Sequence, residues 1–76
     1  MNRVEIYTSN TCKYCNMAKD FLNKNNIDYI EHNISKNPQA MKTLIKIGHM
    51  SVPLIIVGNE IIIVFDKHKI EKLINN

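Results

Sequence analysis

Cys12 and Cys15, with two residues between them, are the side chains of this sequence best suited to chemistry. They stand where a β-branched segment gives way to a segment with helical periodicity. A thiol at a helix N-terminus meets unpaired backbone N–H groups and the positive end of the helix dipole, so we expect a lowered pKa and a reactive thiolate. Cys15 follows one helical turn later and can close a disulfide with Cys12. The pair predicts dithiol exchange, with Cys12 as nucleophile and Cys15 as resolving thiol.

Three other roles for the cysteines compete with redox chemistry. A structural disulfide across so small a loop gains only roughly 2 kcal/mol and is reduced in the cytosol. A zinc site needs four ligands at set spacings, whereas His32, His49 and His68 are isolated from one another. Inert buried thiols are expected of scattered cysteines, not of a pair at a strand–helix junction. Lys13 can act as a cation beside the thiolate or simply as a solvated lysine.

Length and composition limit what else the chain can be. Its 76 residues and 8.8 kDa are expected to form one domain, residues 1–76, with 45% hydrophobic and 22% charged residues. The net charge of +3 comes from scattered lysines without a basic run, which argues against a nucleic-acid partner. The longest apolar stretch, 61–65, is far shorter than the ~20 residues of a membrane span. We expect a cytoplasmic protein that binds no membrane.

The hydrophobic pattern predicts four strands and three helices in the order β-α-β-α-β-β-α. Strands are expected at 4–7, 27–34, 54–57 and 60–64. Helices are expected from Cys12 to the asparagine-rich stretch 23–26, from Pro38 to Gly48, and from Asp66 through Ile74. The first βαβ unit should be parallel and right-handed, and the Gly58-Asn59 loop should join an antiparallel hairpin. The fold class is therefore α/β, with a four-stranded mixed sheet buried on both faces by its helices.

Beyond these patterns, the chain resembles a glutaredoxin, closest to small bacterial glutaredoxin-like proteins. The similarity covers nearly the whole chain and rests on the following segments: 6–8, 12–15, Ala18-Lys19, 51–53 and 65–66. It implies a minimal thioredoxin fold, in which a cis Pro53 faces the cysteine pair and Val52 offers its backbone to a bound thiol. It also implies a substrate-binding surface made of Thr11, Lys13, Tyr14, Ser51, Val52, Pro53, Phe65 and Asp66. From periodicity alone, Tyr14 is equally a member of the apolar helix stripe.

Several residues depart from the family pattern. Lys13 replaces the usual proline between the cysteines, and Ser9 stands where glutathione-using members carry a lysine. Ile63 and Val64 replace paired glycines, and Val cannot adopt the backbone angles of Gly. The resemblance implies no bound cofactor, only the redox-active Cys12–Cys15 disulfide. For the external electron donor, the resemblance implies glutathione or a thioredoxin-reductase-type flavoprotein, and the departures weaken the case for glutathione.

The resemblance implies a monomer that reduces disulfides in proteins or small molecules. An alternative from another class is an iron–sulfur or metal carrier that dimerises through Cys12 of each subunit. A third is a binding module that docks a protein through the surface around Tyr14 and Pro53. Thiol turnover separates the first hypothesis from the third, and a visible charge-transfer absorbance after anaerobic purification would favour the second.

Overall fold

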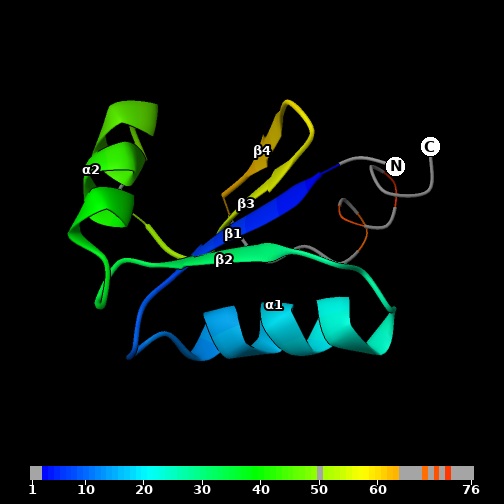
Figure 1. The fold of residues 1–76 in the computed structure, drawn as a ribbon. Helices are drawn as coiled ribbons and strands as arrows, with labels where there is room; N and C mark the ends of the chain where they lie inside the picture. The colour runs from blue at the N-terminus through cyan, green and yellow to red at the C-terminus, as the bar shows by residue number, and fades with distance from the viewer. Residues whose placement is uncertain (1–2, 50, 64–67, 69, 71, 73–76) are drawn as a thin grey trace.

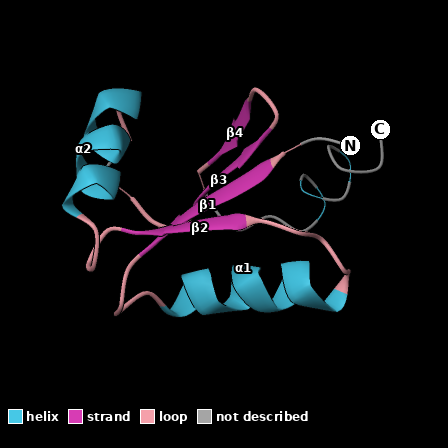
Figure 2. Cartoon of the chain, viewed as in Figure 1, coloured by secondary structure: helices cyan, strands magenta, loops and turns pink. Residues whose placement is uncertain are grey.

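The computed structural model describes residues 3–49, 51–63, 68, 70 and 72. Within them, the elements follow the predicted order (Figures 1 and 2). Their bounds are β1 Val4–Thr8, α1 Lys13–Lys24, β2 Ile30–Asn33, α2 Pro38–Ile47, β3 Leu54–Val57 and β4 Glu60–Ile62. The predicted last helix falls mostly outside these residues, although His68, Ile70 and Lys72 have helical backbone.

The four strands form one mixed sheet in the order β2-β1-β3-β4. The β1–α1–β2 unit is parallel, with Ile6 opposite Glu31, as a helical crossover requires. β3 runs antiparallel to β1, and β4 returns antiparallel beside β3. Gly58 has a positive φ of 62° in the two-residue turn between β3 and β4, a backbone angle that suits glycine. The predicted mixed sheet is confirmed.

The two described helices cover opposite faces of this sheet (Figure 2). On the α1 face, Ala18 and Leu22 pack with alternate residues of the strands: Val4, Ile6, Ile55, Val57 and Ile62, together with Ile70. On the α2 face, Ala40 and Leu44 pack with Tyr7 and Leu54. This division follows from the period of two along each strand, which sends neighbouring side chains to opposite faces.

The ends of the helices follow from their capping residues. Asn37 begins α2 by accepting a hydrogen bond from the Gln39 backbone N–H at 3.0 Å, and Pro38 occupies the first turn. Gly48 ends α2 with a left-handed φ of 93°. After α1, Asn26 adopts a positive φ of 56°, which asparagine tolerates better than most residues. These stops confirm the boundaries predicted from residue type.

The structure corrects the predicted second strand, which was expected to span 27–34. β2 begins only at Ile30, because the chain leaves α1 through a turn in which the Ile27 N–H bonds to the Leu22 carbonyl at 2.9 Å. Ile27 and Tyr29 still pack against the core, but from a loop. Their hydrophobicity explains why these residues lie in the interior, whereas the hydrogen bond from Ile27 to Leu22 explains why their backbone is a turn and not a strand.

The hydrophobic pattern favours burial at three apolar positions that the structure leaves exposed, and for Tyr14 contact with a substrate was the equal alternative. Tyr14 and Ile45 leave 61% and 53% of their surface accessible, so neither belongs to a buried helix stripe. Cys15 takes the inward position that periodicity assigned to Tyr14. The prediction of a sheet covered on both faces is also wrong at β4, where Ile61 is 43% exposed because α2 packs over Tyr7 and Leu54 instead.

Candidate active site

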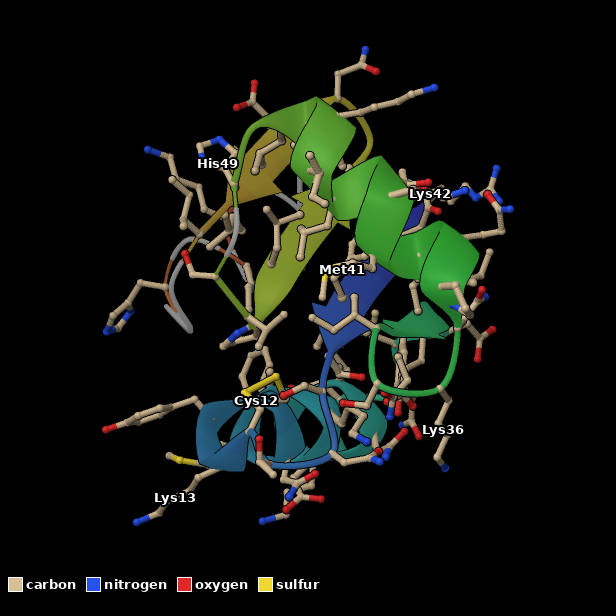
Figure 3. All side chains as sticks on the ribbon, turned by 90° about the vertical axis from the view of Figure 1, so that its left-hand side faces the viewer. Cys12, Lys13, Lys36, Met41, Lys42 and His49 are labelled. Carbon is tan, nitrogen blue, oxygen red and sulfur yellow. A yellow bond between two sulfur atoms is a disulfide. The ribbon has the colours of Figure 1, made fainter. Side chains whose placement is uncertain are left out.

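The first turn of α1 holds the two cysteines. Cys12 is the N-cap residue, with an extended backbone, and its Sγ accepts a hydrogen bond from the Cys15 N–H at 3.1 Å. The two residues form a disulfide whose Cα atoms lie 5.2 Å apart, within the ordinary range (Figure 3). In the reduced protein, the same N–H and the helix dipole would stabilise a thiolate on Cys12.

The two sulfur atoms differ in their access to solvent. Cys12 is half-buried at the end of the helix, whereas Cys15 is completely buried. The Cys15 Sγ lies 4.0 Å from the Tyr7 carbonyl oxygen, at the end of β1. A partner can therefore approach Cys12 and cannot approach Cys15 directly. This asymmetry is what sequential exchange requires of a nucleophile and a resolving thiol.

The loop before β3 reaches the same end of the sheet. The Val52–Pro53 peptide bond is cis, as the resemblance implies, and Pro53 is buried. Tyr7 pairs with Leu54 across β1 and β3, so the residues just before β3 lie beside the end of β1. Val52 packs partly against the α2 cluster, and Ser51 is exposed.

Around the disulfide, the predicted contact residues of α1 are open to solvent. Thr11, Lys13 and Tyr14 are all exposed, and Met17 adds a second apolar side chain, 43% exposed, one turn beyond Tyr14. Lys13 extends away from Cys12 (Figure 3), which favours the interpretation of a solvated lysine. Two other predicted site residues, Phe65 and Asp66, lie outside the described residues.

A polar network behind the cysteines was not predicted. Thr8, 1% exposed, donates its hydroxyl to Glu31 Oε2 at 2.7 Å, and Lys19 donates to the same oxygen at 3.0 Å. The hydrogen bond from Thr8, helped by Lys19 and opposed by partial burial, lowers the pKa of Glu31. The sequence offered one signal: Lys19 lies one turn after Cys15, on a face that packs against the sheet.

The opposite face of the sheet carries a second polar group. His32 Nε2 lies 2.9 Å from Glu5 Oε1, and the His32 ring stacks on Tyr7 with centroids 4.7 Å apart. Burial, and then the charge of Glu5, raise the pKa of Tyr7. His32, which stands apart from the other two histidines in the sequence, is half-buried and partnered.

No three His, Cys, Asp or Glu side chains come together among the described residues in a group able to hold a metal ion. Neither is any described helix long and apolar enough to cross a membrane.

A four-stranded mixed sheet with a disulfide-forming Cys-X-X-Cys pair at a helix N-terminus defines a thiol–disulfide oxidoreductase of the thioredoxin fold. The glutaredoxin family model matches residues 4–62, and the chain belongs to the glutaredoxin family. A glutaredoxin-like 8.6 kDa protein of Clostridium pasteurianum is 35% identical, over 93% of this chain and 96% of that protein.

Two further comparisons concern NrdH proteins. The glutaredoxin-like protein NrdH of Lactococcus lactis is 33% identical over 68% of this chain and 72% of its own length. The structure of the NrdH-redoxin of Escherichia coli superimposes with a TM-score of 0.83 at 28% identity, covering 93% of each chain. The chain is thus similar to small bacterial glutaredoxin-like proteins in sequence and in fold.

Proposed function

We propose that the protein reduces disulfides by a two-step dithiol exchange. The Cys12 thiolate attacks a substrate disulfide, a mixed disulfide forms, and the departing sulfur takes up a proton. The Cys15 thiol then loses its proton and attacks the Cys12 sulfur. The second substrate thiol leaves, and Cys12 and Cys15 remain as an intramolecular disulfide. Two electrons pass from the protein to the substrate in each cycle.

The observation that carries this proposal is the unequal burial of two sulfurs one helical turn apart. Cys12 is accessible at the helix N-terminus, and Cys15 is fully enclosed behind it. Only Cys12 can begin exchange with a large partner, and only Cys15 is held close enough to finish it. Tyr14, exposed beside the pair, and the Ser51-Val52-Pro53 loop at the same end of the sheet are proposed to hold the substrate.

Single cysteine variants test these roles in a protein-disulfide reduction assay. Cys12→Ser should abolish turnover, because the remaining thiol is buried. Cys15→Ser should still form the mixed disulfide through Cys12. It should not complete repeated cycles on protein disulfides, because the thiol that releases the product is missing. Cys12→Ser with full activity would contradict the mechanism. Circular dichroism of both variants shows whether each has kept its fold.

We propose that electrons come from a thioredoxin-reductase-type flavoprotein in preference to glutathione. The relative from Escherichia coli is described as having a thioredoxin-like activity profile. In this chain, Ser9 offers no cation where glutathione-using members have a lysine, and Ile63, 41% exposed, replaces a glycine. A pair that must be re-reduced after each cycle suits a reducing compartment, so we also propose a cytoplasmic location.

The donor is tested by reducing the oxidised protein in two parallel reactions. One contains thioredoxin reductase and NADPH, and the other contains glutathione with glutathione reductase and NADPH. NADPH consumption should be faster in the first reaction at equal concentrations of this protein. Faster reduction by glutathione would overturn the choice of donor and leave the dithiol mechanism intact.

A further inference from the structure

A polar cavity of about 390 Å³ opens between α1 and the exposed edge at β2. Its lining includes Asn10, Asn16, Lys19, Glu31, Asn33 and Lys36. They come from the loop before α1, from α1 itself, from β2 and from the turn after β2. None of them is a cysteine, and the mechanism proposed above uses none of them.

The charge of the lining sums to one unit of positive charge. Lys19 is paired with Glu31 Oε2 at 3.0 Å, so these two charges offset each other. Lys36 has no ion-pair or side-chain hydrogen-bond partner among the residues that the structure describes, although it lies close enough to Glu31 to help lower the pKa of that carboxyl group. Figure 3 shows Lys36 well away from the disulfide. The unbalanced charge in the cavity is therefore the Lys36 ammonium.

The neutral groups of the lining add N–H donors. Asn33 donates to Asn10 Oδ1 at 3.0 Å, and its own Oδ1 accepts from the Ser35 N–H at 2.9 Å, which fixes the orientation of both amides. The Asn10 Nδ2 group is left with N–H bonds to offer, and the Asn16 amide has no partner within the described part of the chain. A cavity with a spare ammonium group and spare amide donors is complementary to an anion.

We propose that this cavity binds a carboxylate group. One negative charge balances the lining, whereas a phosphate dianion would meet the Glu31 carboxylate with an excess of negative charge. The two carboxylate oxygens accept from the Lys36 ammonium and from the amides of Asn10 and Asn16. The carboxylate belongs either to a free organic acid or to an acidic side chain of a docked protein. Asn10 lies two residues before Cys12, which brings the cavity close to the exchange site.

The site is tested by NMR titration of the oxidised wild-type protein with acetate at pH 7 and constant ionic strength. We expect saturable shifts of the Asn10 and Asn16 side-chain amides. Lys36→Gln should weaken binding by about threefold to fivefold, as expected for one exposed charge pair. Lys42→Gln is the matched control, because Lys42 is an exposed lysine of α2, far from Lys36 in Figure 3.

Shifts that do not saturate, or an equal effect of the two lysine variants, would overturn the site. Tighter binding of phosphate than of acetate would overturn the assignment to a carboxylate.

Matched disulfide peptides, with Glu or Gln placed several residues from the cysteine so that the side chain can span the separation between Cys12 and Lys36 seen in Figure 3, distinguish the two sources. If the wild type prefers the Glu peptide and Lys36→Gln removes that preference, the ligand is a substrate side chain. If acetate binds without a peptide preference, the ligand is a free acid. Reduction of a small neutral disulfide by Lys36→Gln stays at the wild-type rate, which separates this test from that of the dithiol mechanism.

Discussion

Tyr14 shows how one exposed side chain changes the interpretation of a helix. Apolar periodicity places it on the buried face of α1, yet it is 61% exposed beside the cysteine pair. Cys15 fills the inward position because the helix begins at Lys13, with Cys12 as its cap. A large aromatic side chain that gains nothing from burial in the core is free to contact a partner.

Replacing Tyr14 with alanine should therefore affect binding and not folding. We expect Tyr14→Ala to lower kcat/KM for a protein disulfide by about tenfold, the loss typical of an interface aromatic. Its urea midpoint should stay near that of the wild type. Tyr29→Ala is the control, because Tyr29 packs partly against the core and its loss should shift the urea midpoint. A normal kcat/KM for Tyr14→Ala would remove this residue from the docking surface.

Glu31 should make stability depend on pH in the acid range. The pKa of Glu31 is lowered in the folded protein, first by the hydrogen bond from Thr8. The carboxylate therefore stabilises the fold fully at a pH above its pKa in the unfolded chain, and this stabilisation is lost as the pH falls through its pKa in the folded protein. The stability difference between wild type and Glu31→Gln should be larger at pH 7 than at pH 3. Urea unfolding across this range measures it, with Glu60→Gln, at the exposed first position of β4, as control. A difference that does not change with pH would contradict the role of Glu31.

At the scale of elements, the buried stripe of α1 attaches the active-site helix to the sheet. Leu22 is completely buried among residues of the strands, whereas Ile45 of α2 is 53% exposed. Both are large aliphatic residues in helices, so the pair isolates the effect of burial. The sequence could not separate them, because each falls at a position that suits an apolar stripe.

Leu22→Ala should destabilise the protein by about 2–5 kcal/mol, from lost burial and the cavity left behind. Ile45→Ala should change stability by less than about 0.5 kcal/mol. Urea unfolding of the two variants gives both values. Similar losses for the two substitutions would mean that the described packing of α1 and α2 is wrong.

The start of α2 depends on a single side chain. Asn37 accepts the Gln39 N–H, so Asn37→Ala should cost about 1 kcal/mol. Asn37→Ser, which preserves a capping oxygen, should recover most of that stability. Thermal unfolding compares the two variants. Equal destabilisation by alanine and serine would show that the cap contributes little.

For the whole molecule, the topology was predictable and the placement of polar groups was not. The element order and the short hairpin turn leave few arrangements, and the observed sheet is the expected one. Strand register, in contrast, cannot be derived from hydrophobic alternation alone. It is register that places Glu31 opposite Ile6 and close to Thr8 and Lys19, and that brings separate segments together around the polar cavity.

The cysteine pair was predictable because its chemistry depends on local structure. A spacing of three residues at a strand–helix junction is enough to place one thiol at the cap and the other one turn behind it. The unequal burial of the two sulfurs depends on the whole fold, since Cys15 is enclosed only where α1 packs beneath the end of β1 (Figure 1). The proposed two-step exchange depends on that difference.

Mass spectrometry of the covalent intermediate tests the assignment of Cys12 as the nucleophile. Reduced Cys15→Ser is mixed with a disulfide-containing protein, quenched with acid and digested without reductant. We predict a stable mixed disulfide in which the substrate cysteine is linked to Cys12, whereas reduced Cys12→Ser gives no adduct under the same conditions. An adduct on Cys15 in the Cys12→Ser protein, formed as fast as the Cys12 adduct, would contradict the assignment of Cys12 as the nucleophile.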